Sequence, residues 1–267
     1  WMTLDLWLEL KFMVKSIISK KILFWYDNNK RILPWRKNTS KEQKLYFTLV
    51  SEFMLQQTQV STVIPYFKRF VQKIPNFKKL SKANDQTLMK LWEGLGYYSR
   101  ARNLKKTAIM INGKFGGILP SNFEDLKSLP GIGDYTSTAI MAIAFNQKFI
   151  PLDGNVERIL KRVLYLRNEK DISKENMQIS KNFFGLSERA SDYAQAIMEL
   201  GALVCRPTSP SCGKCPIRIN CISYKRKDFS LIKKTKKNKI KYYEVNIYMD
   251  ENKMLLIRNN KFNFLKN

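Results

Sequence analysis

Four cysteines lie close together toward the C-terminal end of the chain, and they are its only cysteines. Their spacing is C-x6-C-x2-C-x5-C: Cys205, Cys212, Cys215 and Cys221. Four thiolates in a short segment suit a four-coordinate centre, either a zinc ion or an iron–sulfur cluster. Zinc sites usually combine two tight cysteine pairs, whereas this segment has one. The spacing therefore favours a bulkier iron–sulfur cluster whose corners the ligands surround.

A second candidate for chemistry is a polar row within the mostly apolar segment 51–67, "SEFMLQQTQVSTVIPYF". The apolar residues of this segment recur at helical spacing. Glu52, Gln56 and Gln59 recur at i, i+4 and i+7, so a single helix would align them on one side. Such a stripe usually faces water. Alternatively, it is a row of acid and amide groups that points into a cleft, and the residues alone leave both interpretations open.

Two further motifs place glycine or a carboxylate at the start of a predicted helix. In "LPGIGDYTSTAI" (129–140), Gly131 and Gly133 form a turn before a helix whose free backbone N–H groups can hold a phosphate. In "LDGNVERIL" (152–160), Asp153 precedes a helical stripe of apolar residues. The simpler alternatives are an ordinary connection between helices and an ordinary N-cap.

A fifth motif combines aromatic and basic residues. The segment "WEGLGYYSRARNL" (92–104) places Tyr97 and Tyr98 next to Arg100 and Arg102. Aromatic and basic side chains in a glycine-flanked turn can stack on bases or enter between them. The alternative is a set of core aromatics beside a solvated helix.

The composition favours a polyanionic partner. The chain has 267 residues, 48 Lys and Arg against 22 Asp and Glu, and a net charge of +26. This excess points first to nucleic acid and second to an acidic membrane surface, although coding bias can also enrich lysine. No apolar run is long enough to span a bilayer. The N-terminal segment lacks the uninterrupted apolar region and the small-residue cleavage site of a signal peptide. We therefore expect a cytoplasmic protein with reduced cysteines.

The elements that must position these motifs are mostly helices. Residues 16–146 are predicted to form short helices separated by turns, and helical spacing resumes over 153–204. Residues 224–241 hold nine Lys or Arg and one Asp, which predicts a basic linker. Strand-like residues then flank "DEN" and predict a hairpin. Because the first residue is not Met, we expect Met13 to be the true start, and we expect the chain to stop inside a second, β-containing domain.

Together, "LPWR", the four motifs above and the cysteines resemble the helix-hairpin-helix DNA glycosylases that carry a [4Fe-4S] cluster, in particular the adenine DNA glycosylase family. The resemblance extends from about Trp25 to Cys221. It implies a mainly α, two-lobed fold with a six-helix barrel, a cluster lobe and the start of a Nudix-like domain. The implied parts are an N-terminal helix of the cluster lobe (13–30), the barrel with its helix-hairpin-helix (31–146), the cluster lobe (147–223), the linker (224–241) and an incomplete Nudix-like domain (242–267).

The resemblance also implies roles for individual residues. Glu52 would protonate N7 of adenine, Asp153 would stabilise the positive charge on the sugar, and Tyr135 and Asn155 would hold these groups in place. Tyr135 stands where the endonuclease III family has a Schiff-base lysine, so at most weak incidental strand cleavage is expected. The four cysteines would bind the cluster. The residues expected to contact DNA are Gln56, Gln57, Thr58, Tyr97, Tyr98, Arg100, Gly131 and Gly133.

The function implied by the resemblance is that of a monofunctional base excision repair glycosylase. It would hydrolyse the N-glycosidic bond of adenine mispaired with 8-oxoguanine or guanine in double-stranded DNA, as a monomer associated with the nucleoid. One alternative keeps the fold but excises thymine or an oxidised pyrimidine. Another is a DNA-binding module with inert acids, whose cluster senses redox state.

Overall fold

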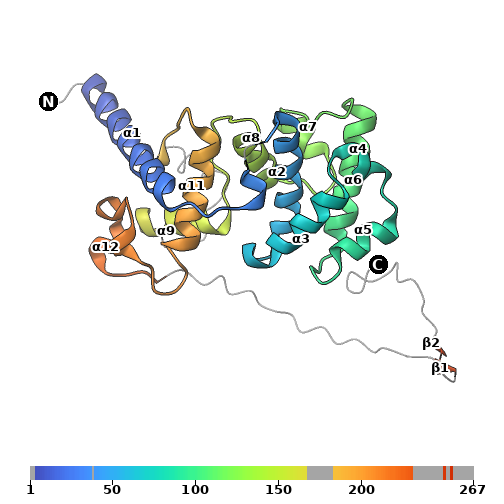
Figure 1. Cartoon of the computed structure of the whole chain (residues 1–267). Coiled ribbons are helices and arrows are strands. Elements are labelled where there is room, and N and C mark those ends of the chain that lie inside the picture. The colour runs from blue at the N-terminus through green and yellow to red at the C-terminus, as the bar shows by residue number, and fades with distance from the viewer. Residues whose placement is uncertain (1–3, 38, 167–182, 231–248, 251–252, 255–267) are drawn as a thin grey trace. The chain divides into compact units, whose positions relative to one another are not determined.

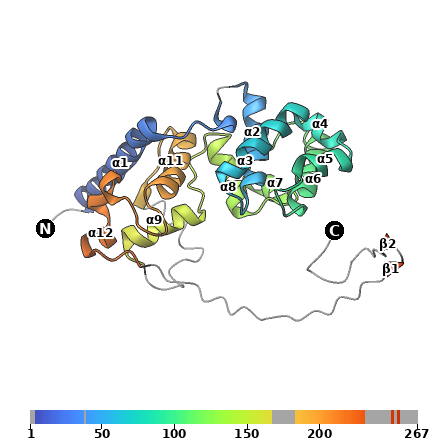
Figure 2. The same cartoon turned by 60° about the horizontal axis from the view of Figure 1, so that its bottom comes forward.

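The computed structural model describes residues 4–37, 39–166, 183–230, 249–250 and 253–254, and these residues are mainly helical, as the sequence predicts. Its elements, labelled in Figures 1 and 2, are α1 (Leu4–Asn29), η1 (Pro34–Arg36), α2 (Lys41–Leu55), α3 (Val60–Lys73), α4 (Phe77–Lys82), α5 (Asp85–Trp92), α6 (Ser99–Lys114), α7 (Phe123–Ser128), α8 (Asp134–Ile143), α9 (Gly154–Leu164), α11 (Ala190–Leu203), η3 (Cys212–Lys214), η4 (Arg218–Asn220), α12 (Ile222–Arg226), β1 (Met249–Asp250) and β2 (Lys253–Met254).

The described helices form one compact unit, and β1 and β2 belong to a second. The two strands pair antiparallel, with Met249 opposite Met254 and Asp250 opposite Lys253. This pairing agrees with the predicted hairpin around "DEN". Most of the basic linker and of the expected Nudix-like domain lies outside the described residues.

Two separate hydrophobic clusters lie within the helical unit. The first extends from Leu45 to Ala144 and is built by α2 to α8. The second combines α1, α9, α11 and the cysteine loops. In both views α2 to α7 lie together, and α1, α9, α11 and α12 lie together (Figures 1 and 2). Each group of helices thus has its own core, while the exact domain boundaries stay a prediction.

Local sequence explains where several helices begin. A short polar side chain accepts a hydrogen bond from a backbone N–H of the first turn, which satisfies a donor that has no partner within the helix. The helices capped in this way are α2, α4, α5, α7 and α9, with Ser40, Asn76, Asn84, Asn122 and Asp153. The apolar stripe predicted for α9 is confirmed, because all of its members are buried: Val156, Ile159, Leu160 and Val163.

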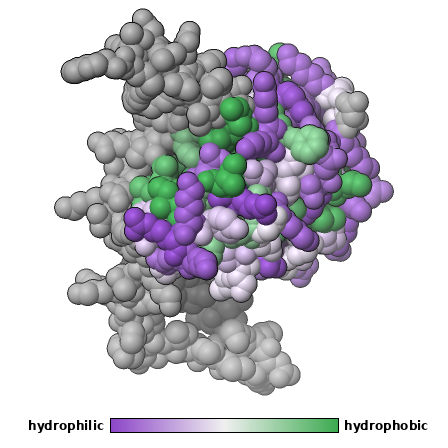
Figure 3. Space-filling model, turned by 90° about the vertical axis from the view of Figure 1, so that its left-hand side faces the viewer, coloured by the Kyte–Doolittle hydropathy of each residue, from purple (hydrophilic) through white to green (hydrophobic). Residues whose placement is uncertain are grey.

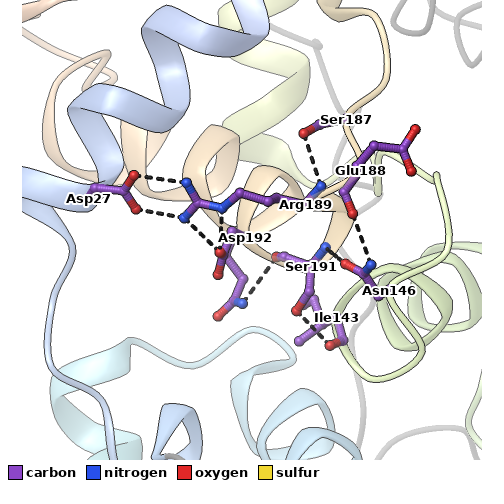
Figure 4. Close-up of polar contacts among 9 residues, drawn as sticks. Asp27, Ile143, Asn146, Ser187, Glu188, Arg189, Ser191 and Asp192 are labelled. Atoms are coloured by element: carbon purple, nitrogen blue, oxygen red, sulfur yellow. Dashed lines mark hydrogen bonds and ion pairs between the residues drawn. The ribbon is translucent and has the colours of Figure 1, made fainter.

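Polar contacts tie the start of α11 to both groups of helices (Figure 4). The guanidinium of Arg189 donates two hydrogen bonds to Asp27 of α1, at 2.7 and 2.9 Å. Ser191 donates from its hydroxyl to the carbonyl of Ile143, at 2.7 Å, and from its N–H to the side chain of Asn146, at 2.9 Å. Helix α11 is therefore held against α1 and the end of α8 together.

The surface matches the charged composition. Figure 3 shows hydrophilic residues around a smaller group of hydrophobic ones on the face that lies to the left in Figure 1. Among the helices that the structure describes, none is both long and apolar enough to cross a membrane.

The turn between α7 and α8 contains the two predicted glycines in different environments. Gly131 has φ +81°, and a Cβ added there would lie 2.9 Å from both Asn103 Cβ and Phe53 Cε1. Gly133 is extended, with φ −101°, and an added Cβ would meet nothing within 4 Å. Only Gly131 therefore requires glycine for conformation and close packing.

We predict that Gly131→Ala lowers the free energy of unfolding by about 2–4 kcal/mol, because left-handed strain and steric overlap add. Gly133→Ala serves as the matched control and should cost less than about 1 kcal/mol. Urea unfolding of both variants measures the difference. Equal destabilisation by the two substitutions would contradict this account of the turn.

Candidate active site

All four predicted catalytic residues line one pocket in the helical unit: Glu52, Tyr135, Asp153 and Asn155. The pocket lies between the segment around η1, the C-terminal end of α2 and the starts of α8 and α9, with α11 as a further wall. Its volume of about 1260 Å³ is sufficient for a nucleotide. Residues that are far apart in the sequence thus converge on one cavity.

Glu52 is buried near the end of α2 and is only 6% exposed. The hydroxyl of Tyr135 donates a hydrogen bond to its Oε2, at 3.3 Å. Burial raises the pKa of Glu52 to about 7, the charge of Asp153 adds to this rise, and the Tyr135 hydrogen bond and Arg36 oppose it. Near neutral pH, a substantial fraction of the Glu52 carboxyl therefore carries a proton.

Asp153 is the N-cap of α9 and also faces the pocket. Its Oδ1 accepts from the backbone N–H groups of Asn155 and Val156, at 2.9 and 2.7 Å. Its Oδ2 accepts from the side-chain amide of Asn155, at 2.8 Å. Burial raises the pKa of Asp153, while these hydrogen bonds oppose the rise. The two interpretations of the "LDGNV" motif are therefore compatible, since one side chain caps the helix and lines the cavity.

Hydrogen bonds continue from Asn155 to the cysteine segment. Arg158 donates from Nη2 to Asn155 Oδ1 and to the carbonyl of Gly201, both at 2.7 Å, and from Nε to the carbonyl of Cys205, at 2.7 Å. A Cβ on Gly201 would lie 2.5 Å from Asn155 Cβ, so glycine lets α11 approach this closely. The orientation of Asn155, and through it Asp153, thus depends on α11 and on the backbone at Cys205.

The sequence motifs did not reveal a buried ion cluster in the same pocket. Glu199 of α11 is fully buried and accepts hydrogen bonds from Arg31, at 2.8 and 3.0 Å, and from Arg36, at 2.7 Å. All three line the pocket. Arg36 Nε is buried without a hydrogen-bond partner among the described residues. The available signal was a single glutamate in the apolar run "YAQAIMELGAL".

The predicted continuous polar stripe is wrong. Helix α2 ends at Leu55 and α3 begins at Val60, so Glu52, Gln56 and Gln59 do not lie on one helix. They nevertheless line the same pocket, because the chain turns between the two helices. A turn, rather than helical periodicity, brings the amides toward the acid.

Several residues predicted to contact DNA are accessible. Gln57 is exposed in the turn after α2, and Thr58 next to it is half-buried. Tyr97 and Tyr98 are 64% and 39% exposed at the start of α6. The side-chain amide of Gln56 approaches the backbone carbonyl of Gly131 at 3.4 Å, and Gly131 and Gly133 are exposed. These positions are compatible with contacts to a duplex.

Arg100 is the exception among these residues. It is only 6% exposed, and its guanidinium donates to backbone carbonyls of the protein. The expected direct contact between Arg100 and DNA is therefore corrected. Backbone carbonyls that lack other partners bind its guanidinium inside the protein, and the motif alone did not reveal them.

The four cysteines line a second pocket together with Arg162, Ile217 and Tyr224. None of the four forms a disulfide, and burial raises the pKa values of Cys212, Cys215 and Cys221. In the described part of the chain, no three or more His, Cys, Asp or Glu side chains are arranged to hold one metal ion. Four thiols that line one pocket are a donor set that either a zinc ion or an iron–sulfur cluster can use.

Sequence comparison assigns the class of protein. The chain belongs to the HhH-GPD superfamily of base excision DNA repair proteins, whose profile matches residues 50–183. Among curated relatives, it is 40% identical to the adenine DNA glycosylase of Buchnera aphidicola subsp. Schizaphis graminum over 84% of this chain and 64% of that protein. It is 42% identical to the adenine DNA glycosylase of Homo sapiens over 77% of this chain and 39% of that protein. The chain thus spans less than two thirds of the length of these relatives.

Solved structures support the same fold. A thermostable thymine-DNA glycosylase aligns with a TM-score of 0.70 and 25% identity, over 80% of this chain and 98% of that one. An endonuclease III in a non-covalent complex with DNA aligns with a TM-score of 0.63 and 21% identity, over 80% and 97% of the two chains. The second likeness bears on the fold alone.

The raised pKa of Glu52 predicts a pH-dependent stability. The folded state retains the proton up to about pH 7, whereas the unfolded state releases it near pH 4.5. This contribution to stability is complete below pH 4.5 and is lost as the pH rises through about 7. Glu52→Gln cannot ionise, so its free energy of unfolding relative to wild type should rise by up to about 3 kcal/mol between pH 5 and pH 8.

Urea unfolding of Glu52→Gln and wild type at both pH values tests this prediction. The control is Glu42→Gln, which alters an exposed glutamate on the same helix. A gain that does not depend on pH would contradict the burial of an ionisable Glu52.

Proposed function

We propose that the chain is a monofunctional DNA glycosylase that hydrolyses the N-glycosidic bond of adenine mispaired with 8-oxoguanine or guanine. The observation that carries the proposal is the buried Glu52 carboxyl, in hydrogen-bond contact with Tyr135 and in one pocket with Asp153. A protein that only binds DNA has no need of a carboxyl held out of water near its neutral form. The curated relatives named adenine DNA glycosylase support adenine as the base.

In this proposal the adenine nucleotide leaves the duplex and enters the pocket. Protonated Glu52 donates to N7 of adenine, and the electron pair of the bond between C1′ and N9 leaves with the base, which departs neutral. The Asp153 carboxylate stabilises the positive charge that develops on the sugar. Water then attacks C1′, and its proton passes to a pocket carboxylate. Tyr135 and Asn155 hold the two acids in position.

The ion cluster supplies groups for recognising the base. Arg36 Nε is a buried donor without a hydrogen-bond partner in the described part of the chain, and it belongs to a side chain that lines the pocket. Its guanidinium is anchored through Nη1 to Glu199, at 2.7 Å. Nε itself is shielded from the cavity, but the Arg36 side chain is 18% exposed, so its terminal N–H groups can meet a purine edge with acceptor nitrogens. The same cluster holds η1 against α11, so recognition and pocket shape are linked.

The DNA-facing elements fit the same function. Gln57, Tyr97 and Tyr98 are exposed and can enter the duplex near the extruded base, and the N-terminus of α8 after Gly133 can face a phosphate. The net charge of +26 favours association with DNA. We further propose that the protein acts as a monomer in the nucleoid.

We also infer that the four cysteines hold a [4Fe-4S] cluster. When bound, such a cluster cross-links its four thiolates and so staples the surrounding loops. Arg162 is 2% exposed, donates to Cys205 Sγ at 3.4 Å, and also donates to the carbonyls of Arg206 and Pro207, at 2.6 and 2.7 Å. It thus places a fixed positive charge beside thiolates that cluster binding would leave negative.

A single-turnover assay tests the glycosylase. Wild type should release adenine from a duplex with adenine opposite 8-oxoguanine, detected as strand cleavage after alkali. Glu52→Gln and Asp153→Asn should each lower the rate at least about 100-fold, because each removes a group that acts in the transition state. The wild-type rate should fall as the pH rises through about 7, where Glu52 loses its proton. Full activity of Glu52→Gln, or release of thymine instead of adenine from a matched duplex, would overturn the assignment.

Metal analysis tests the cluster. We predict about four iron atoms and four inorganic sulfides per chain in anaerobically purified protein, with a brown colour. Replacing Cys215 by Ser should lower the iron content, whereas Ser223→Ala, in the same lobe but without a thiol, should retain it. A colourless protein with about one zinc per chain would refute the inference.

A further inference from the structure

Two surface turns carry exposed side chains on strained backbone. Gln57, between α2 and α3, has φ +56°, and Tyr97, between α5 and α6, has φ +48°. Both side chains are exposed. Left-handed backbone is unfavourable for residues other than glycine, and it persists where the surroundings fix it. The cause of this conformation must therefore lie in contacts of the two turns.

One buried guanidinium joins the two turns. Arg100 Nη2 donates to the carbonyls of Leu95 and Gly96, both at 3.1 Å, in the turn before Tyr97. Arg100 Nη1 lies within hydrogen-bond distance of four oxygens around the turn after α2: the carbonyls of Phe53 (3.2 Å), Met54 (2.8 Å) and Gln56, and Thr58 Oγ1 (3.1 Å). The two terminal nitrogens of one side chain thus serve two segments some 40 residues apart in sequence.

The chemistry of this contact requires arginine. The last carbonyls of a helix lack intrahelical partners, and Nη1 supplies a donor to those at the end of α2. A planar guanidinium can donate in two directions at once, whereas a lysine ammonium is a single point charge. The guanidinium carbon also lies 5.5 Å from the centre of the Tyr97 ring. Lysine at this position could not fix both turns and support the ring.

We propose that Arg100 is a positioning residue that holds Gln57 and Tyr97 at a fixed separation, so that the two side chains enter the duplex as one unit. This inference rests on the proposed function. Because Arg100 is itself only 6% exposed, it acts through these two residues and not through DNA. Its effect should therefore appear when a base must be extruded from an intact stack.

The main test compares Arg100→Lys with wild type on two substrates. One is a fully base-paired duplex around adenine opposite 8-oxoguanine, and the other holds the same adenine in an unpaired bubble, where little unstacking is needed. Arg100→Lys should lose at least about tenfold in single-turnover rate on the duplex and less than about threefold in the bubble. The control Arg69→Lys alters an exposed arginine on α3 that lies over Tyr66 and should stay within about twofold on both. Equal losses on both substrates, or no loss on the duplex, would overturn the proposal.

A double-mutant cycle tests the coupling without an Arg100 variant. The readout is the fluorescence increase of 2-aminopurine next to the target adenine when protein binds, which needs no excision. Gln57→Ala and Tyr97→Ala should each reduce the increase, and the double variant should lose less than the sum of the two effects. Strictly additive effects would overturn the proposal even if Arg100→Lys fails to fold. If wild type unstacks the probe but releases no adenine, the proposed function fails while the positioning role stands.

Discussion

The structure depends on placing two carboxyl groups in one cavity, where they accept different numbers of hydrogen bonds. Asp153 accepts three hydrogen bonds at the start of α9, all of which favour its ionised form. Burial raises the pKa of both carboxyls, but Glu52 accepts only one hydrogen bond, from Tyr135, to oppose this effect. Two carboxyls whose environments separate their protonation states can serve as an acid and as a stabilising anion. In the proposed mechanism, Asp153 at the helix start is the anion, and Glu52, which does not lie at a helix start, is the acid.

Helix α11 holds the parts of the cavity together. It contacts α1, α8 and α9, and its buried Glu199 fixes Arg31 and Arg36 near η1. Its Gly201 leaves space for Asn155, whose side-chain amide donates a hydrogen bond that orients Asp153. A helix without a residue in any of the sequence motifs therefore joins the two cores and shapes the pocket.

The sequence predicted local features well and long-range burial less well. The stripe of α9, the cap at Asp153 and the turn at Gly131 follow from spacing and residue type, which act over a few residues. The contact between Tyr135 and Glu52 joins positions 83 residues apart, so only resemblance to a family anticipated it. The prediction of one polar stripe from Glu52 to Gln59 was wrong, because helical periodicity alone does not reveal that α2 ends at Leu55. Glu199 and Arg100 were missed or misassigned because burial of a charge depends on partners elsewhere in the chain.

The most direct test of the central claim is a pH titration of the Glu52 carboxyl by carbon-13 NMR, with its signal assigned by comparison with Glu52→Gln. We predict a midpoint near pH 7 in the folded protein. A midpoint near the ordinary glutamate value of about 4.5 would contradict it, because the carboxyl would then be ionised throughout the neutral range and could not donate a proton to a base.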